Sequence, residues 1–453
     1  MNQFLRERLL ARHSRYSEYR PTSQGWVGSI PSHWSTKKTS WVFQLTGSGT
    51  TPSSGNDAYF AGEIPWVNTG DLNDDLVTEP ARFVTSAALH DHSALKLYPA
   101  GTVLIALYGA TIGKLGILGF PATVNQACFA MGEPVGIRPK FAFYWFLGNR
   151  EQLVSLSYGG GQPNISGEIV RQVRLSVPPI EEQEQIVRFL DRETAKFDAL
   201  IAKKQRLIEL LQEKRTALIS HAVTQGLDPG GPKKESGIEW LGKIPSHWTV
   251  HRIATIASKI TNGYVGPTRD IFVPEGTRYL QSLHIKSGSI LFERGPYYVT
   301  DSWSKRHPKS ILRVGDVLIV QTGAEVGQCA VVGQEYAGSN CHALIIISPK
   351  PHYIIGGFLG AVIRSSYGRS LLEHVQTGAL HPHLNCTHVR TLPIPCPPLA
   401  DQGLILKDLE IRSARLDALL RTVEAGIERV WEYRTALISA AVTGKIDVRG
   451  EVE

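Results

Sequence analysis

The 453-residue chain contains little cysteine and has no long apolar run. Its five cysteines show no CxxC spacing, which argues against a disulfide framework and fits a reducing cytoplasm. No uninterrupted apolar run approaches the roughly 20 residues that a membrane span needs, and residues 1–8 lack the apolar region of a signal peptide. We therefore predict a cytoplasmic globular protein of several domains that has no membrane partner.

Catalytic motifs are also missing from the sequence. Gly109–Lys114 resembles a phosphate-binding loop only superficially, because three residues instead of four separate its glycines and Leu115 replaces a magnesium-binding Ser or Thr. No dinucleotide or S-adenosylmethionine fingerprint and no nuclease cluster stands out. One polar set lacks the usual zinc spacings and comprises His381, His383, Cys386 and His388. We therefore predict a binding protein with no catalytic residue, no metal and no cofactor of its own.

The chain does contain a long internal repeat. The segment that starts at Val177-Pro178-Pro179 returns at Cys396-Pro397-Pro398, and both copies end in Arg-Thr-Ala-Leu-Ile-Ser. The offset is constant, since 402 − 183 and 434 − 215 both equal 219 for the paired glutamines and arginines. A fixed offset over a whole segment is typical of a structural repeat.

Each copy predicts one long helix, over 180–225 and over 399–445. Apolar residues recur every seven positions and define an apolar seam on each helix. In the first copy they are Leu190, Phe197, Leu211 and Leu218, with Leu200 and Leu207 as a second stripe. In the second copy they are Leu409, Leu416, Val423, Val430 and Leu437, with Leu419 on the other stripe. The residues that interrupt these seams are Lys204, Lys214, Arg412 and Gly426.

The length of these helices favours packing against each other. About 40 residues at ~1.5 Å each make a rod of ~60 Å, which is longer than a small domain is wide. We expect two antiparallel rods that hold two globular domains apart. The alternative is that each helix lies on the surface of its own domain.

The remaining sequence repeats with an offset of 214 residues. A turn flanked by tryptophans ends at Trp34 and again at Trp248, and Gly101–Lys114 matches Gly315–Gln328 as a strand, a glycine-bounded loop and a strand. We predict an α+β fold with an internal pseudo-twofold repeat. Its sheet-rich domains span 21–179 and 237–398, with a helix over 1–20, an exposed linker over 226–236, and domain helices over 141–157 and 353–374.

The loops of the two halves differ in chemistry. Tyr108–Thr111 corresponds to Thr322–Glu325, and Gln162–Asn164 corresponds to His381–His383. A repeated scaffold with different loops suits two modules that read two different targets.

Several motifs together carry a family resemblance. They are the Trp240–Trp248 turn, the Ile64–Val67 run before Gly70-Asp71-Leu72, the Gly-x-x-x-Gly loop, the Pro178–Gln183 helix start and the Arg-Thr-Ala-Leu-Ile-Ser helix end. Over nearly its whole length the chain resembles the specificity subunit of type I restriction–modification systems. It departs from this pattern where Tyr279–Ser282 replaces the Pro-Trp-Val run.

The resemblance implies a role in addressing DNA. Each sheet-rich domain is then a target recognition domain that reads one half of a split, asymmetric DNA sequence. The helices form an antiparallel coiled coil that fixes the spacer and docks two modification subunits, which methylate adenine with S-adenosylmethionine. Restriction subunits add ATP- and Mg-dependent cleavage, so this chain is itself non-catalytic.

Side chains with amide, hydroxyl or cationic groups are the candidates for contact with DNA, because such groups contact base edges and phosphates. In the first domain they are Lys38, Tyr108, Thr111, Lys114, Gln162 and Asn164. In the second they are Gln321, Thr322, Gln328, His381, His383, Asn385 and Arg390. Two other functions stay open: a scaffold with two protein-recognition modules, and a subunit of a related system whose partner chain carries both methyltransferase and nuclease.

Overall fold

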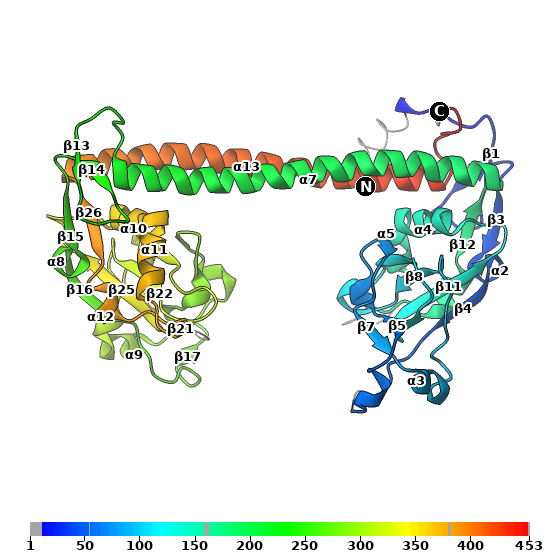
Figure 1. The fold of residues 1–453 in the computed structure, drawn as a ribbon, viewed down its shortest axis with the longest axis horizontal. Coiled ribbons are helices and arrows are strands. Elements are labelled where there is room, and N and C mark those ends of the chain that lie inside the picture. The colour runs from blue at the N-terminus through cyan, green and yellow to red at the C-terminus, as the bar shows by residue number, and fades with distance from the viewer. Residues whose placement is uncertain (1–10, 54, 158–162, 379–381, 452–453) are drawn as a thin grey trace. The chain divides into compact units, whose positions relative to one another are not determined.

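A computed structural model describes residues 11–53, 55–157, 163–378 and 382–451. The chain divides into two compact units (Figure 1). Unit 1 contains Met1–Lys204 and Glu424–Glu453, and unit 2 contains Gln205–Val423. Each unit combines a lobe of strands and short helices with one end of both long helices. The predicted α+β fold, with repeated lobes and two long paired helices, is confirmed.

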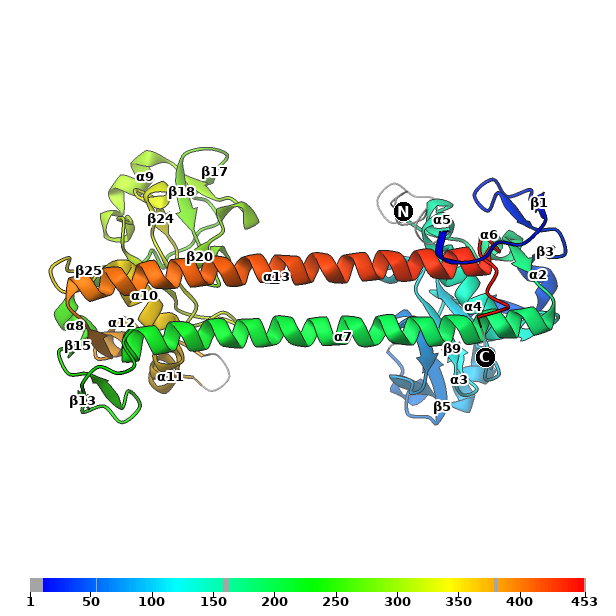
Figure 2. The same ribbon diagram turned by 90° about the horizontal axis from the view of Figure 1, so that it is seen from above.

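The long helices are α7, Ile180–Gln225, and α13, Leu399–Val442. In unit 1 Arg434 Nε lies 3.0 Å from Asp198 Oδ1, and in unit 2 Arg215 Nη1 lies 3.0 Å from Asp417 Oδ1. From Asp198 to Arg215 the chain advances by seventeen residues on α7, and from Arg434 to Asp417 it goes back by seventeen residues on α13. The two helices therefore pair in antiparallel directions. Figure 2 shows the two helices side by side.

One stripe of the predicted seam is correct and the other is wrong. Leu190 and Leu409 are buried, whereas Leu200, Leu207 and Leu419 are 42%, 43% and 52% exposed. The second stripe instead follows the first by four residues and consists of Thr194, Ile201, Ile208 and Arg215 on α7, and Ser413, Leu420, Ile427 and Arg434 on α13. On a helix, the residues three before the first stripe and the residues three after it both lie next to that stripe. The spacing alone therefore could not show which of these two sets faces the partner helix.

Two of the predicted seam interruptions face each other. Lys204 lies opposite Gly426 in unit 1, where a Cβ on the glycine would stand 2.8 Å from Lys204 Nζ. The ammonium end of the lysine therefore occupies the space that the glycine leaves open. Lys214 and Arg412 are exposed and lie off the seam.

The lobe of unit 1 is built on a five-stranded sheet with the order β4-β11-β8-β9-β6. Its strands are Phe43–Ser48, Cys128–Pro134, Val103–Ala106, Leu115–Leu118 and Asp75–Val77. A second sheet, β10-β5-β7, contains Thr123–Val124, Ile64–Val67 and Arg82–Val84. The strand pairs are β1 and β2, Tyr19–Pro21 and Ser29–Pro31, and β3 and β12, Ser35–Lys38 and Arg174–Val177. The helices α2 to α6 are Thr39–Val42, Ser86–Asp91, Pro139–Gly148, Arg150–Ser155 and Gly167–Gln172.

The lobe of unit 2 repeats this plan. Its main sheet, β16-β25-β22-β23, contains Ala257–Asn262, Leu344–Pro349, Val317–Val320 and Cys329–Val331. The second sheet, β17-β21-β18-β24, contains Phe272–Val273, Tyr298–Val299, Thr277–Leu280 and Asn340–Cys341. The strand pairs β13/β14, β15/β26 and β19/β20 are Lys233–Glu235 with Lys243–Pro245, Thr249–Arg252 with Pro393–Cys396, and Ile285–Lys286 with Ser289–Ile290. The helices α8 to α12 are Ile253–Ile256, Asp301–Arg306, Gly356–Arg364, Ser366–Val375 and Cys386–Val389.

Both predicted domain helices are interrupted. Asn149 separates α4 from α5 with ψ at 20°, and its Nδ2 donates to the carbonyl of Trp145 at 2.7 Å. Ser365 separates α10 from α11 in an extended conformation, and its Oγ accepts from the Gly368 N–H at 3.1 Å. Local polar side chains therefore end helices that the apolar pattern would continue.

Two predicted boundaries also need correction. The last part of the linker predicted over 226–236 is strand β13, which pairs with β14 as β1 pairs with β2 in unit 1. The predicted N-terminal helix over 1–20 lies outside the described residues up to residue 10, and Tyr19–Pro21 is a strand. Both segments are strands because each pairs with the strand that follows it, and this pairing cannot be predicted from the composition of the segments.

A buried glutamine joins each long helix to its lobe. Gln183 is fully buried in the first turn of α7. Its Oε1 accepts from the Arg138 N–H at 2.7 Å, and its Nε2 donates to the carbonyls of Gly136 at 3.2 Å and Pro178 at 2.9 Å. The start of α7 is thus tied to the chain that leads into α4.

The same joint occurs in unit 2. Gln402 is also fully buried, and its Oε1 accepts from the Ile355 N–H at 2.8 Å. Its Nε2 donates to the carbonyls of Tyr353 at 3.0 Å and Pro397 at 2.8 Å. The glutamine of the repeated Pro-Pro-x-x-x-Gln motif is therefore a structural residue in both copies.

Unit 2 also holds a buried histidine, and from it we predict that the stability of the folded protein depends on pH. His284 is fully buried; Nδ1 accepts from the Gln281 N–H at 2.8 Å and Nε2 donates to the Gly295 carbonyl at 2.9 Å, so the ring is neutral. Burial lowers the pKa of His284 below its ordinary value of 6.5. The unfolded chain then binds more protons than the folded one below about pH 6.5, and we expect stability to fall there by at most about 1.4 kcal/mol per pH unit.

Urea unfolding followed by tryptophan fluorescence between pH 7.5 and 5.5 measures this effect. His284→Asn should show a shallower dependence on pH than the wild type, whatever its absolute stability. The matched control is His352→Asn, because His352 is exposed. Equal slopes for both variants would contradict the prediction.

Candidate nucleic-acid interface

A glycine-bounded turn lies at the same place in both lobes. In unit 1 it connects β8 to β9, with Gly109 at a φ of +78° and Gly113 at +76°. In unit 2 it connects β22 to β23, with Gly323 at +91° and Gly327 at +83°. Side chains are strained in this backbone region, so the Gly-x-x-x-Gly spacing serves a tight hairpin and not a phosphate.

A second loop crosses each hairpin at its first residue. Tyr108 forms a bridge with Asn164 in unit 1, and Thr322 forms the equivalent bridge with His383 in unit 2. The next backbone contact is also repeated. The Leu384 N–H donates to the Gln321 carbonyl at 2.9 Å, and the Ile165 N–H of unit 1 donates to the Leu107 carbonyl in the same way. The structure thus brings together the two loops whose chemistry differs between the halves.

The crossing in unit 2 contains a buried amide. Gln321 is 7% exposed, and its Nε2 lies 3.4 Å from Nε2 of His383. Its Oε1 has no hydrogen-bond partner among the described residues. Thr322 beside it is exposed and His383 is half-buried, so one hydroxyl and part of one imidazole are accessible at this crossing.

Apart from Lys38, the other candidates fall into three groups. Lys114 and Gln328 close the two hairpins through their backbone carbonyls, and Thr111 lies within the first turn. Asn385 caps α12, since its Oδ1 accepts from the His388 N–H at 2.8 Å, and Arg390 is exposed just after that helix. The candidates Gln162 and His381 lie outside the described residues. All of these DNA contacts remain predictions.

Lys38 lies apart from the crossing, in a cluster that the sequence did not indicate. Its Nζ donates to Gln172 Oε1 at 2.6 Å and lies 5.7 Å from the ring centre of Trp41. Arg174 lies 5.6 Å from the same ring, and Trp41 is 60% exposed. Lys38 lies on β3 and Arg174 on β12. Only the pairing of these two strands shows that both cations lie near the same exposed ring.

The histidine- and cysteine-rich loop of unit 2 makes ordinary hydrogen bonds. Cys386 Sγ donates to Asn262 Oδ1 at 2.8 Å, and burial raises the pKa of this thiol. His388 Nδ1 lies 3.2 Å from the Val375 carbonyl. In the part of the chain that the structure describes, no three His, Cys, Asp or Glu side chains gather as metal ligands.

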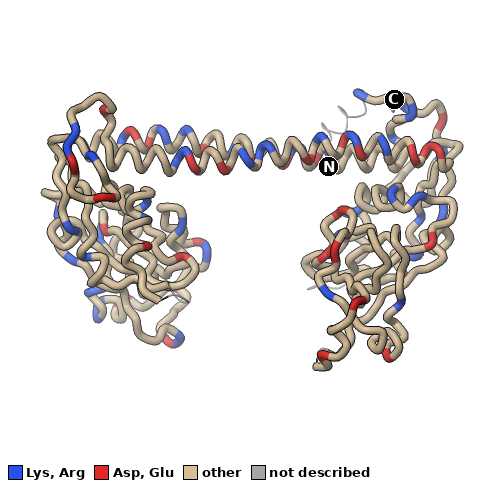
Figure 3. Tube along the Cα trace, viewed as in Figure 1, with Lys and Arg blue, Asp and Glu red and all other residues tan. Residues whose placement is uncertain are grey.

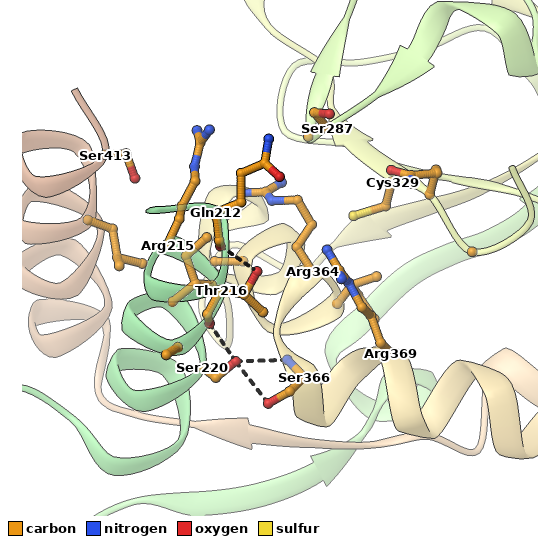
Figure 4. A pocket seen from close by; sticks show the side chains of 18 of the residues that line it. Gln212, Arg215, Thr216, Ser220, Ser287, Cys329, Arg364, Ser366, Arg369 and Ser413 are labelled. Atoms are coloured by element: carbon orange, nitrogen blue, oxygen red, sulfur yellow. Dashed lines mark hydrogen bonds between the residues drawn. The ribbon is translucent and has the colours of Figure 1, made fainter. Parts of the chain in front are cut away.

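Unit 2 also contains a groove of about 1290 Å³, with Arg364 and Ser287 on its wall (Figure 4). The equivalent arginine of unit 1, Arg150, pairs with Asp74, a residue with the same left-handed backbone as Ser287. Arg364 has no such carboxylate, and its Nη1 has no hydrogen-bond partner among the described residues. The repeated scaffold therefore differs in charge as well as in its loops.

Comparison with known proteins identifies the scaffold. Residues 31–210 match the family model described as "Type I restriction modification DNA specificity domain". The chain is 29% identical over 254 residues to the type I restriction enzyme MjaIX specificity subunit of Methanocaldococcus jannaschii, an alignment that covers 54% of this chain but only 56% of that protein. It is 22% identical over 409 residues to the MjaVIII specificity subunit of the same organism, which covers 88% of this chain and 90% of that protein.

A solved structure shares the fold. It comes from work on "complex assembly and conformational transition of the type I R-M system", and it matches with a TM-score of 0.66 at 16% identity over 91% of this chain and 98% of that chain. The fold is thus one with a duplicated lobe and a duplicated long helix. Residues 31–210 carry the DNA specificity domain of type I restriction–modification systems, and over most of its length the chain is similar to the specificity subunits of these systems, as its motifs predicted. None of the helices in the described ranges is both long and apolar enough to cross a membrane.

Proposed function

We propose that this chain reads a bipartite, asymmetric DNA sequence, one half with each lobe. The observation that carries this proposal is the repeated crossing of two loops on one scaffold, with Tyr108 and Asn164 in unit 1 but Thr322 and His383 in unit 2. Hydroxyl, amide and imidazole groups can hydrogen-bond to base edges, and different groups select different bases. The chain's net charge of +7 favours association with a polyanion.

The long helices serve assembly in this proposal. They set the spacer between the two half-sequences and dock two modification subunits, and restriction subunits join that complex. S-adenosylmethionine, ATP and magnesium belong to those partners, and the chain supplies no catalytic group. The continuous course of α7 and α13 through both units supports this role.

Selection of bound DNA tests the proposal. The chain is reconstituted with its modification subunits, incubated with random duplex DNA, and the bound pool is sequenced. Two enriched half-sequences at a fixed spacing are expected. No enrichment would overturn the proposal and favour a scaffold that binds proteins, whereas enrichment with a single partner chain that both methylates and cleaves would favour the related system.

A further inference from the structure

A basic segment that begins on α9 distinguishes unit 2 from unit 1. The exposed side chains of Lys305, Arg306 and Lys309 fall within five residues, and Asp301 is the one acidic residue of 301–309. None of the three basic side chains forms an ion pair among the described residues. Figure 3 colours Lys and Arg positions blue, and Figure 1 labels α9 within the lobe of unit 2.

The internal repeat supplies a control for this observation. Thr300 caps α9 by accepting from the Trp303 N–H, as Thr85 caps α3 by accepting from Ala88. His307 Nδ1 lies 2.8 Å from the Trp303 carbonyl, as His92 Nδ1 lies 3.0 Å from that of Ala88. The two helices are thus equivalent at an offset of 215.

This offset aligns the basic pair with a histidine and an aspartate, and with no lysine or arginine. His90 takes the place of Lys305, and Asp91, which accepts from the Tyr59 hydroxyl at 3.0 Å, takes the place of Arg306. The cations on α9 are therefore not required by the scaffold.

An aromatic cluster joins α9 to the candidate interface. The ring of Trp303 stacks on His307 at 3.9 Å, and Tyr264 meets each of them edge-on at 5.0 Å. Tyr264 follows Asn262, which accepts the hydrogen bond from Cys386 Sγ at the start of α12. The basic segment is thus connected to the loop that carries His383 and Asn385.

We infer that Lys305 and Arg306 of α9 bind phosphates of the DNA duplex, so that unit 2 holds the backbone beside the bases that its loops read. This inference rests on the proposed function. Each phosphate that a cation neutralises releases counterions and adds about 0.9 to the slope of log affinity against log salt. Unpaired, adjacent cations next to aromatic rings suit a phosphate backbone, and the continuity with the crossing loops favours DNA over an acidic protein surface.

The test uses the complex with its modification subunits and a duplex that carries the selected sequence. Affinity is measured by fluorescence anisotropy between about 50 and 200 mM salt. Because each phosphate contact contributes ~0.9 to the slope of log affinity against log salt, Lys305→Ala/Arg306→Ala should reduce the size of this slope by about 2. The sequence recovered from a bound pool should stay the same, because phosphate contacts carry no base information. The matched control, Lys233→Ala/Lys234→Ala, removes two exposed cations from β13 of the same unit and should keep the wild-type slope.

The outcomes separate the inference from the function on which it rests. A wild-type slope in the α9 variant, or the same decrease of the slope in the control, overturns the inference. The proposed function still stands in that case if the wild type binds DNA sequence-specifically. Loss of the modification subunits from the variant, with DNA affinity per complex unchanged, also overturns it and assigns α9 to a protein surface. A wild type that selects no sequence overturns the proposed function itself. Circular dichroism of each variant verifies that it is folded.

Discussion

Gln183→Leu should lower the free energy of unfolding of unit 1 by about 3–5 kcal/mol. Leucine removes a side chain that makes three buried or part-buried hydrogen bonds to backbone groups, and each unpaired group costs about 1–3 kcal/mol. Gln402→Leu should destabilise unit 2 in the same way, because Gln402 makes the same three contacts. Few single substitutions on a helix surface approach this size.

Urea unfolding with circular dichroism and tryptophan fluorescence checks this prediction. Gln205→Leu is the matched control, since Gln205 is an exposed glutamine of α7 and the same exchange there should change stability by less than about 0.5 kcal/mol. A loss of comparable size in the control, or none in Gln183→Leu, would show that these glutamines do not hold the helices to the lobes.

Lengthening both long helices should change the DNA sequence that is methylated. Seven residues inserted after Lys204 in α7 and seven before Glu424 in α13 add two turns to each helix and keep the seam in register. Seven residues extend a helix by about 10 Å, which corresponds to about three base pairs of duplex at ~3.4 Å each. We expect methylation of the original target to be lost and a target with a spacer about three base pairs longer to be gained.

Sequencing of methylated adenines in a host that carries the modification subunits measures this outcome. An insertion in α7 alone is the control, because it shifts Asp198 and Arg215 out of register with their partners on α13 and should abolish methylation. Continued methylation of the original target by the double insertion would mean that the helices do not set the spacer.

The correct and incorrect sequence predictions have different physical origins. The start of α7 could be predicted because Pro178 and Pro179 end the preceding strand and suit a first helical turn. The glycine turn could be predicted because only Gly109 and Gly113 adopt its positive φ without strain. The exposed stripe at Leu200 could not, since the choice between two neighbouring stripes depends on the partner helix.

The candidate interface shows the same division. The sequence indicated which loops differ between the halves, and Tyr108, Asn164, Thr322 and His383 do lie at the two crossings. It missed α9, because the charges at Lys305 and Arg306 become informative only when the fold aligns that helix with α3.

The sequence by itself determined the duplication and the two long helices, because constant offsets and seven-residue spacing are properties of the chain alone, and its motifs carried the family resemblance. Only the tertiary structure decided which helix faces meet, how Lys204 fits opposite Gly426, and that the end of the predicted linker is strand β13. The reason is that these features arise from partners far apart in sequence, where packing and strand pairing outweigh local preference.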